Sequence, residues 1–149
     1  MPISPATSLN PVPYPEEHHE SFKPLRRRVL IVEDEEGALK LLERRFRKMG
    51  FDVAAAQDGL DALDQARRKE SDLIILDLVL PKLSGEEVCK AIREDDDRHI
   101  SGIPIIMLTG KDTVADRIVG KVIGANAYLT KPFDFDDLMD KVIELSIPE

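Results

Sequence analysis

Short apolar runs alternate with longer amphipathic stretches over most of the chain. The runs at residues 29–32, 51–56, 72–76, 103–108 and 125–129 predict β-strands, because each is too short for a buried helix and is bounded by polar or turn-forming residues. Such short apolar runs are typical of strands that are buried on both faces of a sheet.

Between these runs, apolar residues recur at helical spacing. We expect helices over residues 37–49, after a cap at Asp58, after a cap at Ser84, and over residues 112–123 and 135–145. The residues expected on the buried faces of the first three helices are Leu39, Leu42, Phe46, Met49, Leu60, Leu63, Ala66, Val88 and Ile92.

The pattern therefore alternates five strands with five helices and predicts an α/β fold. Strict alternation favours a doubly wound, five-stranded parallel sheet with helices on both faces, joined by right-handed crossovers. Ligands of such sheets bind outside the carboxyl ends of the strands. The residues that follow each strand are therefore the first candidates for function.

The first 25 residues differ in composition from the rest of the chain. They hold six of the ten prolines (Pro2, Pro5, Pro11, Pro13, Pro15 and Pro24) and few large aliphatic residues. A segment of this kind buries too little apolar surface to offset the entropy lost on ordering. We expect a disordered, proline-rich arm over residues 1–25 and one domain over residues 26–149.

Charge and cysteine content exclude several classes of function. The formal net charge is −8, which argues against nucleic acid as a direct partner, since that affinity comes from Lys and Arg. Cys89 is the one cysteine, so an intrachain disulfide or cysteine metal cluster is impossible. No apolar run is long enough to cross a bilayer, and no secretory signal is present at the N-terminus. We expect a cytoplasmic protein without a membrane partner.

Polar residues with complementary chemistry follow four of the predicted strands. Glu33, Asp34 and Glu35 follow the first, Asp77 the third, Thr109 the fourth and Lys131 the fifth. An acid after a strand is usually only a turn former or a helix cap. Four such positions on four different strands, all at the same edge of the sheet, favour a shared site instead.

The residue types indicate phosphoryl chemistry with a metal ion. Crowded carboxylates are costly unless a cation neutralises them, and oxygen ligands without His or Cys indicate Mg²⁺. An aspartate can itself act as a nucleophile and form an aspartyl-phosphate. The transferred group then needs positive charge and hydrogen-bond donors around its oxygens. Asp77, Asp34, Lys131 and Thr109 could supply this set.

Four ordered motifs resemble the receiver domains of bacterial two-component response regulators, which have the CheY-like, flavodoxin-like fold. They read Val-Leu-Ile-Val-Glu-Asp-Glu at 29–35, Asp-Leu-Ile-Ile-Leu-Asp-Leu-Val-Leu-Pro at 72–81, Ile-Met-Leu-Thr-Gly at 106–110 and Tyr-Leu-Thr-Lys-Pro-Phe at 128–133. The resemblance extends over residues 28–145 without a break.

The resemblance implies a metal site around a phosphoacceptor. Asp77 would accept the phosphoryl group and also contact Mg²⁺. Asp34 would bind Mg²⁺ directly, Glu33 would bind it through water, and the backbone carbonyl of Val79 would complete the site.

It also implies residues that sense the phosphoryl group. Thr109 would hydrogen-bond to it and Lys131 would pair with it, aided by a cis peptide bond before Pro132. Thr109 and Tyr128 would act together as the switch, Tyr128 turning inward when Thr109 moves.

Two positions that depart from the usual pattern of the family, and a third that bears on its chemistry, stand near the site. Glu33 replaces the commoner aspartate, and Gly110 replaces a usual alanine. Val79, two residues after the acceptor, has no polar group that could orient an attacking water. We therefore expect a protein that is not an enzyme, accepts one phosphoryl group on itself and loses it slowly.

The resemblance also predicts partners. A sensor histidine kinase or phosphotransfer protein would donate the phosphoryl group, and residues 112–123, 125–129 and 135–145 would form the face that binds a downstream effector protein. We expect a monomer or a phosphorylation-dependent dimer. Only seventeen residues follow Pro132, too few for a helix-turn-helix, so we expect output through protein contact.

Other functions remain open at this stage. The chain could be the receiver fragment of a longer DNA-binding response regulator. A metal-dependent phosphohydrolase is disfavoured, because Val79 stands where a second aspartate is normally needed. A dinucleotide-binding enzyme is disfavoured because acids occupy the turn after the first strand. A receiver that binds partners without phosphorylation is disfavoured by the intact acid, threonine and lysine set.

Overall fold

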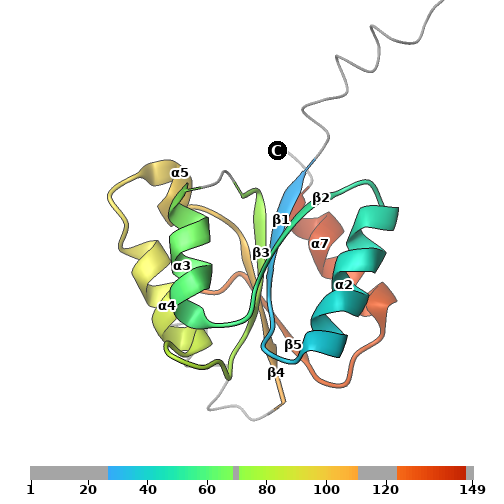
Figure 1. The fold of residues 1–149 in the computed structure, drawn as a ribbon. Coiled ribbons are helices and arrows are strands. Elements are labelled where there is room, and N and C mark those ends of the chain that lie inside the picture. Colours follow the sequence, from blue (N-terminus) through green and yellow to red (C-terminus); the bar gives the residue numbers. More distant parts are fainter. Residues whose placement is uncertain (1–26, 69–70, 111–123, 147–149) are drawn as a thin grey trace, which may run out of the picture.

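A parallel five-stranded sheet forms the centre of the molecule in a computed structural model that describes residues 27–68, 71–110 and 124–146 (Figure 1). The strand order is β2-β1-β3-β4-β5, and every pairing is parallel. The predicted doubly wound sheet is therefore confirmed. The strands are β1 (Arg28–Val32), β2 (Asp52–Ala56), β3 (Leu73–Asp77), β4 (Ile105–Thr109) and β5 (Ala127–Thr130).

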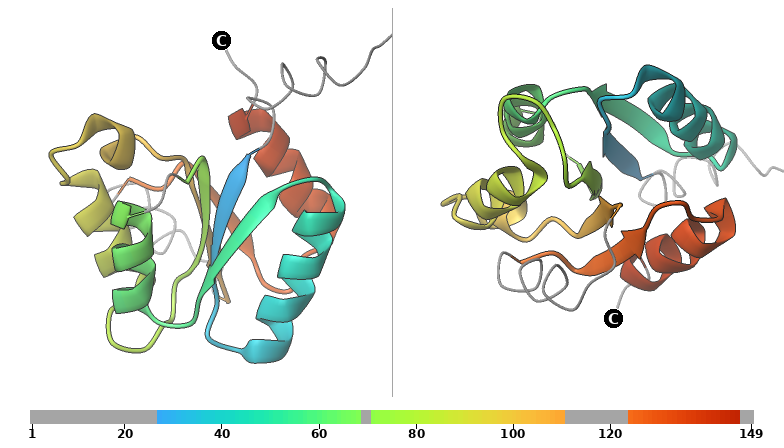
Figure 2. Two further views of the ribbon diagram at one scale, coloured as in Figure 1. Left: turned by 45° about the horizontal axis from the view of Figure 1, so that its top comes forward. Right: turned by 90° about the horizontal axis from the view of Figure 1, so that it is seen from below.

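Helices cover both faces of this sheet, as the end-on view in Figure 2 shows. Helices α2 and α7 lie on one face, and α3, α4 and α5 lie on the other. Within the described residues, none of these helices has the length and apolar character required to span a membrane. Their bounds are α2 (Glu36–Lys48), α3 (Gly59–Arg68), α4 (Gly85–Arg93), α5 (Arg98–Ser101) and α7 (Phe135–Ser146).

The strands send alternate side chains into two separate cores, because successive residues of a strand point to opposite faces. One core joins β1, β3 and β4 to α3 and α4, and its buried strand residues are Leu30, Val32, Ile74, Leu76, Ile105 and Met107, together with Ala56 of β2. The other core joins the same strands to α2 and α7, and its strand residues are Val29, Ile31, Leu73, Ile75, Ile106 and Leu108. Strands β3 and β4 are buried along their whole length.

The helix starts follow the predicted capping chemistry. Asp58 accepts a hydrogen bond from the Asp61 amide at 2.8 Å, and Ser84 forms a reciprocal capping box with Glu87 at the start of α4. The predicted helix over 112–123 and the arm over 1–25 lie outside the described residues.

Two residues expected in the core are exposed. Met49 follows the last residue of α2, where the chain turns away through Gly50 in a left-handed conformation, and its side chain is 56% exposed. Leu60 is 54% exposed because α3 instead buries the small residues Gly59, Ala62 and Ala66. A large side chain does not fit that closely packed face, so periodicity alone placed Leu60 wrongly.

The short helix α5 was also not predicted. Asp97 begins it by accepting a hydrogen bond from the His99 amide at 2.9 Å. The acidic stretch at 95–97 therefore ends in a helix cap.

Arg93 at the end of α4 ties together the segments that precede β4 and β5. Its guanidinium donates hydrogen bonds to the carbonyl oxygens of Gly124, Ser101 and Ile103 and to Oδ1 of Asn126, all at 2.8–2.9 Å. Partial burial lowers the pKa of Arg93, but a guanidinium remains charged in proteins. This network fixes the amino-terminal edge of the sheet.

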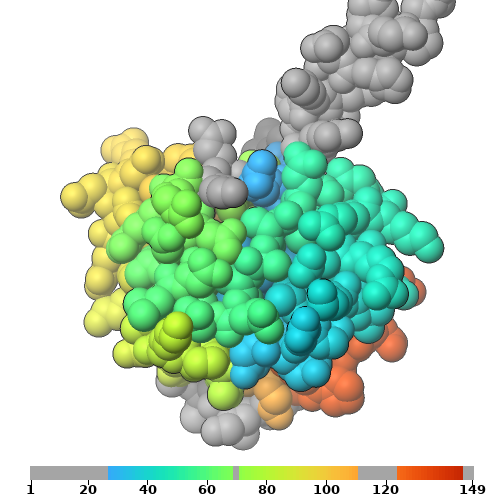
Figure 3. All heavy atoms as spheres, viewed as in Figure 1, coloured from blue at the N-terminus to red at the C-terminus, as the bar shows by residue number. Residues whose placement is uncertain are grey.

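The exposed edge of the sheet at β2 is partly shielded by side chains. Figure 3 shows that α2, β2 and α3 form one continuous surface here. Gln65 of α3 donates a hydrogen bond to the Ala55 carbonyl at 2.7 Å. Occupied edge groups are less available for pairing with another strand.

Gly85, the first residue of α4, lies directly against the strand end that carries Asp77. A Cβ atom at this position would come within 2.2 Å of the Asp77 carbonyl oxygen and 2.9 Å of the Leu78 Cα. Because both neighbours are backbone atoms, they cannot move aside without displacing the strand end.

We expect Gly85→Ala to lower the free energy of unfolding by about 2–3 kcal/mol, through overpacking. Gly110→Ala is the matched control, since no atom lies within 4 Å of a Cβ built there. It should change stability by less than about 1 kcal/mol. Urea denaturation of the two variants measures the difference, and equal stabilities would contradict this account of Gly85.

Candidate functional site

The predicted site residues gather at the carboxyl edge of the sheet, the lower edge in Figure 1. Asp77 is the last residue of β3 and Thr109 the last of β4, whereas Glu33 and Lys131 each follow the end of a strand. Parallel pairing brings these ends together: Val32 lies opposite Leu76, so Glu33 is level with Asp77.

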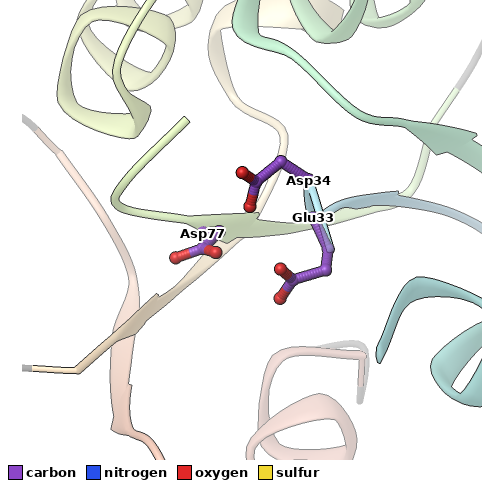
Figure 4. A group of neighbouring side chains, drawn as sticks. All are labelled: Glu33, Asp34 and Asp77. Atoms are coloured by element: carbon purple, nitrogen blue, oxygen red, sulfur yellow. The ribbon is translucent and has the colours of Figure 1, made fainter. Parts of the chain in front are cut away.

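Three carboxylates form the centre of this edge. One carboxylate oxygen from each of Glu33, Asp34 and Asp77 lies within 4.8 Å of the other two, and Figure 4 shows the three side chains beside one another. Glu33 is 2% exposed and Asp77 is 5% exposed, whereas Asp34 is open to solvent. The site therefore combines two buried acids with an accessible one.

Lys131 connects two of these acids. Its ammonium lies 2.9 Å from Oε1 of Glu33 and 3.0 Å from Oδ2 of Asp77. Its backbone amide donates a hydrogen bond to the Thr109 carbonyl at 2.7 Å, which holds the loop after β5 beside β4. The peptide bond to Pro132 is cis, as the resemblance implied.

The charges at the site do not cancel. Burial lowers the pKa of Lys131, but hydrogen bonds to Glu33 and Asp77 outweigh this effect and raise that pKa above its ordinary value. Lys131 is therefore a cation at neutral pH. One ammonium facing three carboxylates leaves an excess of negative charge, which favours an additional cation.

The donor set fits Mg²⁺. All three ligand candidates offer carboxylate oxygens, the hard ligands that this ion prefers. Asp34 and Asp77 could bind the ion directly. Glu33 has less freedom to do so, because Oε1 contacts Lys131 and Oε2 accepts a hydrogen bond from the Glu35 amide at 3.1 Å.

Val79 lies at the mouth of the site. Its amide donates a hydrogen bond to Oδ1 of Asp77 at 3.3 Å, and its side chain is 70% exposed. The two oxygens of Asp77 therefore have different partners, the Val79 amide on Oδ1 and Lys131 on Oδ2. The proposed role of the Val79 carbonyl in metal binding stays a prediction.

Thr109 and Tyr128 lie on adjacent strands near this edge. Thr109 is 2% exposed, and Tyr128 of β5 lies opposite Met107 and packs against the core that contains α3 and α4. Their action as a switch stays a prediction.

Two contacts of the site were missed from sequence. The contact between Glu33 and Lys131 was not expected, although both residues follow strands at the same edge. Gln57 donates a hydrogen bond to the Asp34 carbonyl at 3.3 Å and so helps fix the acidic loop. Its position directly after β2 was the signal that could have identified it.

Comparison with known proteins identifies the family. The family model described as the response regulator receiver domain matches residues 29–143. The chain is also 43% identical over 109 residues to the alkaline phosphatase synthesis transcriptional regulatory protein PhoP of Bacillus subtilis (strain 168). That match covers 73% of this chain and 44% of PhoP, so the chain spans less than half the length of this curated relative.

Solved structures agree with this result. The chemotaxis response regulator CheY4 of Vibrio cholerae is 30% identical with a TM-score of 0.75, over 80% of this chain and 98% of CheY4. The receiver domain of the sensor histidine kinase PA1611 from Pseudomonas aeruginosa PAO1 is 30% identical with a TM-score of 0.74, over 81% of this chain and 98% of that domain. The PA1611 structure has a magnesium ion coordinated in its active site cleft.

The family match over residues 29–143 includes nearly the whole sheet and the residues at its carboxyl edge, and the fold is the CheY-like fold. The chain therefore belongs to the response regulator receiver domain family of two-component signalling.

Proposed function

We propose that this chain accepts a phosphoryl group on Asp77 in a Mg²⁺-dependent reaction and signals by a change in its surface. The observation that carries the proposal is the environment of Asp77, a nearly buried carboxylate that contacts Lys131 and lies beside Asp34 and Glu33. Acids that serve as surface charges or helix caps are usually exposed, whereas the Asp77 carboxylate is buried and paired. Its surroundings suit a nucleophile.

In the proposed step, a carboxylate oxygen of Asp77 attacks the phosphorus atom of the donor. The new phosphorus–oxygen bond replaces the bond from phosphorus to the donor atom, which leaves with its electron pair. Lys131 can turn from Asp77 to an oxygen of the transferred group while keeping its contact with Glu33. A bound Mg²⁺, held by Asp34 and Asp77, would neutralise developing charge on the phosphoryl oxygens.

The donor would be a sensor histidine kinase or a phosphotransfer protein, so the bond that breaks would be a phosphorus–nitrogen bond. Thr109 would then bind the phosphoryl group, and Tyr128 would turn inward. The resulting change would alter the face formed by β5, α7 and residues 112–123, of which the last lie outside the described residues. That face would bind a downstream effector.

The similarity to PhoP favours a second candidate output. PhoP is named as a transcriptional regulatory protein, and this chain matches less than half of it. Phosphorylation of this domain could therefore control an attached DNA-binding domain in a longer protein. A phosphohydrolase is less well supported, since Val79 offers no acid two residues after the nucleophile.

Incubation with acetyl phosphate and Mg²⁺ should add one phosphoryl group to each chain, detected by intact-protein mass spectrometry. Asp77→Asn should abolish the addition, because the amide is a far weaker nucleophile. Asp64→Asn on α3 is the matched control, since that exposed acid lies outside the site, and it should be phosphorylated normally. Release of many phosphates per chain would indicate a hydrolase and contradict the proposal.

Mg²⁺ should bind the unphosphorylated chain and raise its Tm, because a ligand that binds only the folded state stabilises it. Asp34→Asn should weaken Mg²⁺ binding about ten-fold or more, through loss of a charged oxygen ligand. Isothermal titration calorimetry measures the affinity. Equal affinities for the wild type and Asp34→Asn would show that the ion binds elsewhere.

The aspartyl-phosphate should persist for minutes rather than seconds without a phosphatase, because the exposed Val79 side chain cannot orient water. Val79→Asn should shorten this lifetime about three-fold or more by adding a polar group near the reacting bond. Val79→Leu is the matched control, because leucine has nearly the same shape as asparagine but no polar group. It should not shorten the lifetime of the aspartyl-phosphate. Time-resolved mass spectrometry after removal of acetyl phosphate distinguishes these outcomes.

A further inference from the structure

The loop between β3 and α4, residues 78–84, carries Val79 at the mouth of the acidic site. The first residue of this loop is fixed on both sides, because the Leu78 amide donates a hydrogen bond to a carbonyl of β4 and the Gly85 amide donates one to the Leu78 carbonyl, both at 2.8 Å. Val79 is held less firmly, since its side chain is 70% exposed and its amide makes a longer hydrogen bond of 3.3 Å to Asp77. The position of the Val79 backbone therefore depends on what holds the rest of the loop.

The second half of this loop contains a strained turn. Lys82 has a φ of 72°, and in the part of the chain that the structure describes it is the one residue other than glycine with a positive φ. The Leu83 amide donates a hydrogen bond to the Pro81 carbonyl, two residues earlier, at 2.8 Å. A hydrogen bond of this span around a residue with positive φ is typical of the rarer and more strained kind of γ-turn. Such strain persists only where neighbouring residues hold the turn in place.

The start of α3 holds this turn through its backbone. The Gly59 amide donates a hydrogen bond to the Pro81 carbonyl at 3.1 Å, so this carbonyl accepts one hydrogen bond from α3 and one from within the turn. A Cβ atom on Gly59 would lie 2.1 Å from the carbonyl oxygen of Leu83 and 2.5 Å from the Cβ atom of that residue. The helix backbone therefore lies directly against the loop backbone, and only glycine fits at this position.

An ion pair adds a weaker contact between α3 and the turn. The Lys82 ammonium lies 3.5 Å from Oδ2 of Asp58, and the lysine side chain is 60% exposed. Exposed ion pairs contribute little to stability, because water and salt screen them. We therefore expect the backbone contacts of Gly59, rather than this ion pair, to determine where the loop lies.

Helix α3 is a firm support for the turn. It lies beside α4 on the same face of the sheet (Figure 2), and Ala62 and Ala66 are buried in the core on that face. The Leu83 side chain packs against the same core. The turn is therefore held by both α3 and the core. Val79 and Leu80 form the short span between this fixed turn and the fixed end of β3.

We propose that Gly59 and Lys82 are positioning residues for the metal site at Asp77. The start of α3 keeps the turn at Lys82 in its strained form, and the turn keeps the Val79 backbone beside Asp77, where its carbonyl would bind Mg²⁺. Neither positioning residue needs to contact the ion. The place of one carbonyl matters because Mg²⁺ demands near-octahedral geometry with ligands at about 2.0–2.1 Å. This inference rests on the proposed function, since the Mg²⁺ site belongs to that function.

Two substitutions at the exposed Lys82 separate the turn from the ion pair. Lys82→Gly and Lys82→Val both remove the contact with Asp58, but glycine adopts a positive φ readily and a β-branched residue does so rarely. Lys82→Gly should bind Mg²⁺ with an affinity within about two-fold of the wild type, because it loses only an exposed ion pair. Lys82→Val should bind Mg²⁺ at least about five-fold more weakly, because the turn cannot keep its form. Isothermal titration calorimetry of the full chain with Mg²⁺ measures both affinities.

Gly59→Ala tests the contact from the side of α3. The added methyl group would displace Leu83 and the turn with it, so the affinity for Mg²⁺ should fall at least about five-fold. Ala66→Gly is the matched control, because it weakens the same helix at a buried position about two turns away from Gly59. This control should bind Mg²⁺ with an affinity within about two-fold of the wild type. Circular dichroism shows whether each variant is folded during the titration.

The outcomes separate this inference from the proposed function. Absence of Mg²⁺ binding by the wild type would overturn both. If the wild type binds Mg²⁺, equal affinities of Lys82→Gly and Lys82→Val overturn the inference alone, whether both are retained or both are lost. An equal loss in Gly59→Ala and Ala66→Gly would indicate a general weakening of α3 and would also overturn it. If Gly59→Ala does not fold, the two substitutions at the exposed Lys82 decide the question.

Discussion

Repulsion among carboxylates at one end of a parallel sheet is the constraint on which this site depends. Glu33, Asp34 and Asp77 lie together because β1 and β3 are adjacent and end at the same level. Lys131 relieves part of the repulsion by contacting two of the three acids. The remaining negative charge and the carboxylate oxygens favour a small, hard cation at this place. Under the proposed function, the same charge balance would prepare Asp77 for anionic oxygens that arrive beside it.

The fold holds Asp77 in place from several directions. Strand β3 lies in the middle of the sheet and is buried along its length, so Asp77 has a rigid base. Gly85 packs against the Asp77 backbone, while the Val79 amide and Lys131 contact separate carboxylate oxygens. Asp34 and the Val79 side chain beside it are exposed to solvent. This arrangement allows a partner to approach without disturbing the scaffold.

Much of this architecture could be predicted from sequence, because strand length and alternation determine the sheet and hence its functional edge. The convergence of Asp34, Asp77, Thr109 and Lys131 followed from that edge alone. The ion pair between Glu33 and Lys131 did not, since the two residues are 98 positions apart and no local pattern specifies which acid a lysine selects. Leu60 was misplaced because close packing of α3 favoured small residues over large ones.

Because the sheet has one core on each face, a deletion or insertion within a strand changes which core the later side chains enter. Deleting one residue within β3 would turn its later side chains to the opposite face, moving the Asp77 carboxylate out of the acidic cluster. Connections at the far edge are held by Arg93 through the carbonyl oxygens of Gly124, Ser101 and Ile103, and of these Gly124 has a positive φ that other residues rarely adopt. An insertion at the far edge and outside the Arg93 network would therefore leave both the acidic cluster and that network in place.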